Sequence, residues 1–306
     1  MAASTVSTAF TEQYSALVYM LAQQKGSKLK MCVRNETIQN ARNAYFERLG
    51  TADVQLITTR HGDTPLNEIP HSRRRLTPAD YNTATLLDNQ DQLKMLIDPK
   101  SPYAVAQAMS LGRTLDDIIY DAALGDVSTG QSGGTSVAFK DDSRSMNGDG
   151  TITDLGTLAA AATETIITLA KILDMMQLFN TEDVDPDITK YWLVSPQEIA
   201  DLLDIEEATS ADYVTLKALQ QGKIESWAGF KWIWSNRLDL DAAGSTCTRT
   251  LAWAEDGLIL GTAENITSRI TERDDKNYSI QVYSEMSCGA IRLEGAKVHE
   301  ALMLVA

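Results

Sequence analysis

The chain has 306 residues, which is enough for one large or two ordinary domains with a sizeable buried core. Its apolar content is 43%, and no apolar run approaches the ~18 residues that a membrane span requires. The formal net charge of −15 disfavours nucleic-acid binding as the main task, because contact with phosphates needs a basic surface.

Charge is unevenly distributed along the chain. Residues 1–76 carry ten Lys and Arg against six Asp and Glu, whereas residues 77–306 carry 17 against 36. The N-terminal residues MAASTVSTAFTEQY lack a charged segment followed by an apolar one, so no signal peptide is expected. Residues 10–24 have a mixed apolar pattern that predicts a short helix ending at Gly26, within an N-terminal arm.

Residues 34–79 are predicted to form a long projecting excursion. Strand-forming side chains dominate its first half, while Gly62, Pro65, Pro70 and Pro78 interrupt a second half that is poor in apolar residues. Connections of this length are usually functional or disordered. The run Arg73-Arg74-Arg75 is the one dense basic cluster, and it fits either a solvated loop or an anchor for an acidic partner.

Residues 101–125 predict one long helix. Ser101 and Pro102 suit its start, Gly125 suits a left-handed C-terminal cap, and apolar residues recur at i, i+3 and i+4 between them. On this helix Arg113 is placed to pair with Asp117, and Asp116 and Asp121 are expected to face away from the apolar stripe.

The remaining elements alternate before the pattern becomes antiparallel. Residues 126–153 predict a surface loop; residues 155–179, 196–203 and 210–222 predict helices; and residues 191–195 and 230–235 predict strands. Residues 250–253 and 258–260 suggest a strand pair around the turn Glu255-Asp256-Gly257. Residues 266–272, 278–286, 290–293 and 297–305 predict successive strands.

No motif indicates catalysis, a cofactor or a metal. Residues 145–156 resemble a calcium loop of the EF-hand type, but Ser145 and Gly156 occupy the positions of its strongest acidic ligands, so a surface turn is favoured. The three histidines show no ligand spacing, and no P-loop or GxGxxG is present. Cys32, Cys247 and Cys288 have no CxxC spacing, which favours free thiols in a reducing compartment.

Several phrases, in collinear order, resemble the major capsid proteins of tailed bacteriophages, in particular a podovirus-like set with the Hong Kong 97-type capsid fold. They include CVRNETIQNARNAYFERLG, HGDTPLNEIPHSRRRLTPADY, LIDPKSPYAVAQAMSLGRTLDD and AWAEDGLILG, and they cover most of the chain. The resemblance implies an α+β fold with a long spine helix, an extended hairpin called the E-loop, and peripheral and axial domains.

The resemblance also implies a division of the chain. Residues 1–33 would be the N-terminal arm, 34–79 the E-loop, 80–125 the peripheral domain with spine helix 101–125, 126–260 the axial domain, and 261–306 the return strands of both domains. Because Arg73, Arg74 and Arg75 fall on the return limb of the E-loop, they are expected to contact a neighbouring acidic subunit.

The function implied is that of a major capsid protein that self-assembles, as hexamers and pentamers, into an icosahedral shell around double-stranded phage DNA. Expected partners are other copies, a separate scaffolding protein, a portal and a decoration protein, with no specific DNA binding, no membrane and no enzymatic activity. The expected location is the virion capsid, and the host bacterial cytoplasm during assembly. The alternatives are the shell of an encapsulin-like nanocompartment and, in a different class, a cytoplasmic α/β enzyme.

Overall fold

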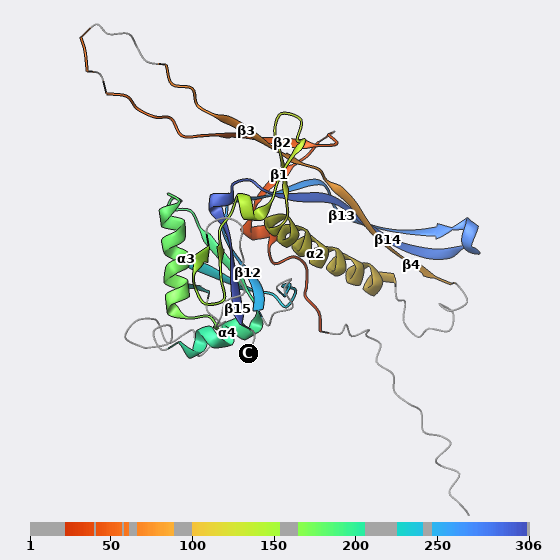
Figure 1. Ribbon diagram of the computed structural model, residues 1–306. Helices are drawn as coiled ribbons and strands as arrows, with labels where there is room; N and C mark the ends of the chain where they lie inside the picture. Colours follow the sequence, from red (N-terminus) through yellow and green to blue (C-terminus); the bar gives the residue numbers. More distant parts are fainter. Residues whose placement is uncertain are drawn as a thin grey trace, which may run out of the picture. The chain divides into compact units, whose positions relative to one another are not determined.

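The computed structural model describes residues 22–39, 41–56, 58–60, 66–88, 100–153, 165–205, 225–240 and 247–304 (Figure 1). The helix expected at 210–222 lies outside the described residues, as does most of the one expected at 10–24. The chain divides into two compact units, which are described separately below. The first comprises Met1–Gly26, Asp80–Arg113 and Asn265–Met286, and the second comprises Ser27–Ala79, Thr114–Glu264 and Ser287–Ala306.

The fold is α+β, with few helices and many strands (Figure 1). In the described residues the helices are α2 (Lys100–Leu124), α3 (Leu169–Thr181) and α4 (Pro196–Asp204), with single 3₁₀ turns at Lys30–Cys32, Phe139–Asp141, Asp274–Lys276 and Gly295–Lys297. The strands in the same part of the chain are β1 (Arg34–Thr37), β2 (Ala44–Leu49), β3 (His71–Leu76), β4 (Ala79–Leu87), β5 (Val127–Thr129), β6 (Thr135–Val137), β7 (Ser145–Met146), β8 (Ile152–Thr153), β9 (Lys190–Val194), β10 (Ser226–Trp227), β11 (Phe230–Trp234), β12 (Cys247–Ala254), β13 (Leu258–Arg273), β14 (Ser279–Arg292) and β15 (Val298–Leu304).

The long helix predicted at 101–125 is confirmed as α2, which begins one residue earlier and ends one residue earlier. One detail of the prediction is wrong: Arg113 donates to Gln23 and to the carbonyl of Gln24, while Asp117 pairs with Arg237. Asp116, which was expected to face away from the apolar stripe, is buried: it is 5% exposed, and its carboxylate accepts hydrogen bonds from the backbone of Lys28 and Leu29.

The first unit packs the N-terminal half of α2 against the strands of its sheet. Leu87, Ile280 and Val282 form a small apolar cluster with Tyr103 and Ala104 of the helix. Gln107 of the helix is 6% exposed and donates to the Val282 carbonyl at 3.1 Å and to Thr85 Oγ1 at 3.0 Å. These bonds satisfy a polar side chain that would otherwise be costly to bury.

The second unit is built on a seven-stranded sheet in the order β10-β11-β9-β12-β15-β7-β8. The predicted strands at 191–195 and 230–235 are confirmed as β9 and β11, which are neighbours in this sheet and pair in parallel. The strand pair expected around Glu255-Asp256-Gly257 is wrong in its pairing. β12 lies between β9 and β15, whereas β13 leaves the turn for the four-stranded sheet β1-β13-β14-β4.

One face of the seven-stranded sheet carries the main core of this unit. Trp192 and Val194 of β9 and Phe230 and Trp232 of β11 meet side chains of α3 and α4 in a single apolar cluster. The rings of Trp192 and Trp232 stack with centroids 5.0 Å apart. Because side chains alternate along a strand, the FKWIW sequence of β11 delivers its large aromatics to the same face.

The helices that cover this face begin at capping residues. Ser195 accepts a hydrogen bond from the Glu198 backbone and Glu198 returns one to the Ser195 backbone, which is a capping box before Pro196 at the first helical position. Residues 155–164 of the helix predicted at 155–179 lie outside the described residues, and residues 165–168 are not helical. The described helix α3 begins after Thr168, an extended N-cap residue whose hydroxyl accepts from Lys171.

The loop predicted at 126–153 is only partly a surface loop. It contains β5, β6, β7 and β8, and Met146 is fully buried in the main core. Its Gly, Ser, Thr and Asp content favoured turns, but short strands added to the edges of existing sheets depend on distant partners. The pairing of β7 with β15 is of this kind, since it joins Met146 to Ala301.

His299 of β15 is fully buried beside the Phe179 ring, 4.7 Å between centroids. Burial lowers its pKa to about 4, from 6.5 in the unfolded chain, so the unfolded state binds more protons between these values. The stability from neutral His299 is therefore complete above pH 6.5 and is lost as the pH falls toward 4. On acidification, we expect the His299→Leu variant to lose up to about 3 kcal/mol less of its free energy of unfolding than the wild type.

Urea unfolding at pH 7.5 and pH 4.5 gives the pH-induced change in unfolding free energy of each protein. Comparing this change between wild type and variant cancels the carboxylate titrations that the two proteins share. Equal acid sensitivity in wild type and variant would contradict the assignment.

Candidate functional site: the root and tip of the projecting hairpin

The predicted projecting excursion contains an antiparallel hairpin formed by β2 and β3. The register pairs Ala44 with Leu76 and Leu49 with His71. The segment Arg34–Thr37 is not part of this hairpin, because β1 pairs in parallel with β13. Beyond the paired strands the two limbs of the hairpin continue outward (Figure 1). The side chain of Asn67 on one limb donates a hydrogen bond to the Asp53 carbonyl on the other.

The three consecutive arginines of β3 point to two different faces. Arg74 shares a face with Leu76 and lies opposite Phe46, so it is 4% exposed, whereas Arg73 and Arg75 lie on the other face and are half-buried. This separation follows from the two-residue period of a strand. The hairpin does fold back onto its own unit, because β3 also pairs with β5 in the sheet β2-β3-β5-β6.

Arg73 and Arg75 bond within the hairpin sheet. Arg73 forms an ion pair with Glu47 on the facing strand and lies 5.7 Å from the centroid of the Tyr45 ring. Arg75 donates to the Ser132 carbonyl at 3.3 Å, and its side-chain stem packs against Gly133. Gly133 has a φ of +70°, and a Cβ there would approach Arg75 to 2.7 Å, so only glycine suits the position.

Arg74 belongs to a buried ionic network around Asp142. Arg74 donates to Asp142 at 2.6 Å and to the backbone carbonyl of Arg292 at 2.7 Å. Arg292, which is fully buried, donates to the second oxygen of Asp142 at 3.0 Å. The guanidinium of Arg292 also reaches the carbonyls of Ala123 at 2.5 Å and Gly125 at 3.0 Å. One carboxylate thus ties the hairpin to the C-terminal end of α2.

The electrostatics of this network follow from its burial. Burial alone would raise the pKa of Asp142, but the hydrogen bonds and charges of Arg74 and Arg292 hold it below its ordinary value. Two guanidiniums against one carboxylate leave excess positive charge, which lies at the negative end of the α2 dipole. Burial lowers the pKa of Arg292, which is the cost of desolvating it.

The left-handed cap expected at Gly125 is wrong, and the network explains why. Gly125 is not among the described residues with positive φ; its N–H donates to the Asp121 carbonyl at 2.7 Å. Arg292 satisfies terminal carbonyls that a left-handed glycine turn would otherwise help to satisfy. Glycine is still needed there, because a Cβ would lie 2.7 Å from the Asp121 oxygen.

A second arginine ties the hairpin to the same region. Arg48 of β2 donates to the Leu293 carbonyl at 2.8 Å. Burial and then the charge of Arg74 lower the pKa of Arg48. Sequence reasoning missed Asp142, Arg292 and Arg48 as parts of one cluster, because they are separated by up to 244 positions and no local pattern relates them.

The tip of the hairpin exposes apolar side chains. Val54, Leu56 and Leu66 are 97%, 88% and 93% exposed. Exposed apolar residues grouped on one segment mark interaction sites more often than scattered ones do. The sequence predicted that the second half of 34–79 is poor in apolar residues, and Leu66, one of the few it has, lies in solvent.

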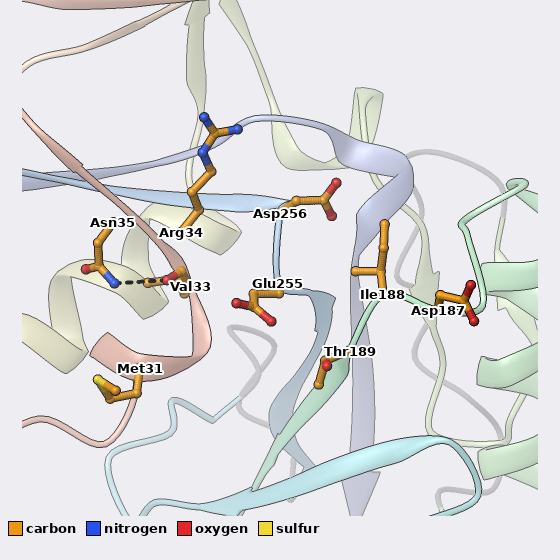
Figure 2. A pocket seen from close by; sticks show the side chains of 9 residues that line it. All are labelled: Met31, Val33, Arg34, Asn35, Asp187, Ile188, Thr189, Glu255 and Asp256. Atoms are coloured by element: carbon orange, nitrogen blue, oxygen red, sulfur yellow. Dashed lines mark hydrogen bonds between the residues drawn. The ribbon is translucent and has the colours of Figure 1, made fainter.

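A separate recess of about 550 Å³ lies in the second unit between β1 and the loops at 187–189 and 255–256 (Figure 2). Three carboxylates and one guanidinium line it, of which Arg34 is bonded to Glu36 and Asp256 to Lys297. The described residues that line it are Met31, Val33, Arg34, Asn35, Asp187, Ile188, Thr189, Glu255 and Asp256. None of these is a histidine, cysteine or serine. Among these described residues the one side-chain hydroxyl is that of Thr189, and no histidine accompanies it as a base.

The described residues contain no group of three or more His, Cys, Asp or Glu side chains placed to hold a metal ion. The residues 147–151 form a turn in which Asp149 accepts from the Thr151 backbone at 2.9 Å. No helix in this part of the chain is long and apolar enough to cross a membrane.

Solved structures with the same arrangement are phage capsids. The cyanophage Pam1 capsid matches with a TM-score of 0.73 and 14% identity, covering 99% of this chain and 98% of that chain. The capsid of cyanophage P-SCSP1u matches at 0.71 and 16% identity, covering 97% and 93%, and that of Ralstonia phage GP4 at 0.70 and 9%, covering 97% and 95%. The fold is therefore the Hong Kong 97-type capsid fold.

Family comparison gives the particular class. The model of the phage capsid protein family matches residues 6–305, so the chain belongs to that family. No curated protein matches the sequence. The chain is a structural protein of the tailed-phage capsid shell, which confirms the resemblance seen in its sequence.

The two faces of β3 predict opposite effects for neighbouring arginines. Arg74→Gln removes one partner of a buried carboxylate, and we expect it to lower the free energy of unfolding by about 3 kcal/mol. Arg73→Gln removes a partly exposed pair and should cost less than about 1 kcal/mol. Urea unfolding of the two variants makes the comparison, and equal effects would show that the network does not anchor the hairpin.

Gly295 predicts a second sensitive position at the same network. A Cβ on Gly295 would lie 1.9 Å from the Asp142 carbonyl oxygen, so Gly295→Ala must displace the backbone that holds Asp142. We expect a loss of about 3 kcal/mol or more. Gly134→Ala is the control, because its Cβ would meet only Ser132 Oγ, at 3.7 Å. Calorimetric melting that leaves Gly295→Ala as stable as Gly134→Ala would contradict the packing.

Proposed function

We propose that many copies of this chain assemble, as hexamers and pentamers, into an icosahedral shell that encloses double-stranded phage DNA. The observation that carries the proposal is the match of the capsid family model to residues 6–305. Closed symmetry of this kind lets one chain repeat a few contacts many times. A nanocompartment or an α/β enzyme has no comparable support.

The hairpin is the segment best suited to reach a neighbouring subunit. Its root is fixed by Asp142, while Val54, Leu56 and Leu66 near its tip lie in solvent. Burying such side chains against another subunit gains roughly 1.5–3 kcal/mol each. The hairpin is then an arm that lies over an adjacent copy and gains stability only in the shell.

Arg73, Arg74 and Arg75 take different parts in this proposal. Arg73 and Arg75 lie on the partly exposed face of β3, beside their own partners Glu47 and Ser132, and are assigned contacts with acidic side chains of a neighbour. Arg74 acts from inside, because its bonds to Asp142 set the direction of the hairpin. Such contacts weaken as salt rises past about 0.15 M, where the screening length is near 8 Å.

The domain scheme carried over from the family assigns residues 1–33 to the N-terminal arm, 34–79 to the E-loop and 80–125 to the peripheral domain. Residues 126–260 would form the axial domain. Residues 261–306 would return through both, and the place of β15 within the seven-stranded sheet supports an axial share of this segment.

The remaining partners follow from the proposed assembly. A separate scaffolding protein would set the shell size, a portal would occupy one vertex, and a decoration protein would bind outside. The acidic chain would enclose DNA without binding it specifically, since a charge of −15 repels phosphate. Assembly would take place in the host bacterial cytoplasm, and the shell would have no enzymatic activity.

The hairpin tip gives the test of this function. We expect the triple variant Val54→Ser, Leu56→Ser and Leu66→Ser to melt at the same temperature as the wild type, because these side chains are already in solvent. It should nevertheless form no closed shells when it is produced with the scaffolding protein. Electron microscopy and sedimentation velocity measure the yield of shells.

The control is Leu173→Ser on α3, which removes a 51% exposed leucine from outside the hairpin. It should assemble as the wild type does. Normal shells from the triple variant would remove the hairpin from the assembly mechanism. A wild-type chain that never forms shells would overturn the proposed function itself.

A further inference from the structure

The turn between β13 and β14 holds an unusual backbone. Four non-glycine residues among those described have positive φ: Asp183, Ala228, Asn277 and Tyr278. Asp and Asn tolerate the left-handed region, and Ala228 is a small residue that precedes Gly229 in a tight turn. Tyr278, with a φ of +56°, is the bulky exception.

The sequence places tyrosine where turn chemistry favours glycine. Asn277 and Tyr278 are two consecutive left-handed residues, with φ of +50° and +56°, an arrangement for which Asn-Gly is the preferred pair. Backbone strain of this kind persists only where surrounding structure holds it, and it concentrates at functional positions.

The strands hold the turn firmly. Arg273, the last residue of β13, donates two hydrogen bonds to the Asp275 carboxylate, both at 2.7 Å. A third goes to Gln281 of β14 at 2.9 Å. The Asp275 backbone N–H also donates to Asp274 at 2.9 Å. The segment that presents Tyr278 is therefore pre-organised.

The side chain of Tyr278 is 64% exposed, more than any other aromatic side chain in the described part of the chain. Burial of the Tyr278 ring within its own subunit therefore contributes little stability to offset the strain of its left-handed backbone. We propose that Tyr278 is a contact residue between copies of this chain: a rigid, strained turn presents its ring for burial against a second copy.

The partner follows from the chemistry of the residue and from the proposed shell, on which this inference rests. Tyrosine combines a large apolar ring with a hydroxyl and loses little conformational entropy on burial, so it is enriched at the centres of interfaces. A pre-organised turn also lowers the ordering cost of association. The partner that a capsid protein meets many times is another copy of itself.

The test separates the ring from the backbone. Tyr278→Gly removes the ring and relieves the strain, so the subunit should melt about 1–3 °C higher than the wild type. Its yield of closed shells with the scaffolding protein should fall at least tenfold. Asn277→Gly is the matched control, because it changes the adjacent left-handed residue and keeps the ring; it should assemble as the wild type does.

Each outcome has one meaning. Normal shells from Tyr278→Gly, or a lower melting temperature of its isolated subunit, would overturn the inference, since the ring would then be dispensable or would stabilise its own chain. Equal failure of Asn277→Gly would do the same by showing that the turn, and not the ring, matters. Absence of shells from the wild type would instead refute the proposed function and this inference with it.

Discussion

The bond of Asp142 to two buried arginines is the constraint on which the arrangement of the hairpin depends. The β2–β3 hairpin has only one apolar face, so packing alone gives it little to fix its direction. Arg74 supplies a directional link to Asp142, and Arg292 carries that link to the carbonyls at the end of α2. A buried carboxylate with one partner would gain little after desolvation. Two partners and a helix C-terminus make the cluster both stable and specific in geometry.

Elements with strong local signals could be predicted from sequence. The signals were the capped apolar stripe of α2, the alternation in FKWIW of β11 and the Ser-Pro start of α4. Each signal lies within the element itself, and the predicted bounds agree with the observed ones to within about one residue. Features set by distant partners could not. The pairing of β12 with β15, and the short strands within 126–153, depend on segments tens to more than a hundred residues away. The Gly125 conformation depends on Arg292 for the same reason.

The run of three arginines shows why a cluster in sequence is not a cluster in space. In a loop, Arg73, Arg74 and Arg75 would form one positive patch. In a strand they alternate, so Arg74 enters the interior beside Leu76 while its neighbours stay on the opposite face. The run was singled out correctly as unusual. Only the register of β3, fixed by β2 and β5, shows that its middle member serves the chain's own fold.

The exposed side chains of this protein suit two states of the subunit, free in solution and assembled in a shell. Before assembly the subunit must not aggregate, and a net charge of −15 serves that need. We propose that in a shell the exposed apolar positions gain partners without any change in the fold. Contacts of roughly 1–3 kcal/mol each are too weak to hold two subunits, because association itself costs more than one of them returns. Repeated round a closed shell they add, so stability belongs to the complete particle and not to any pair within it.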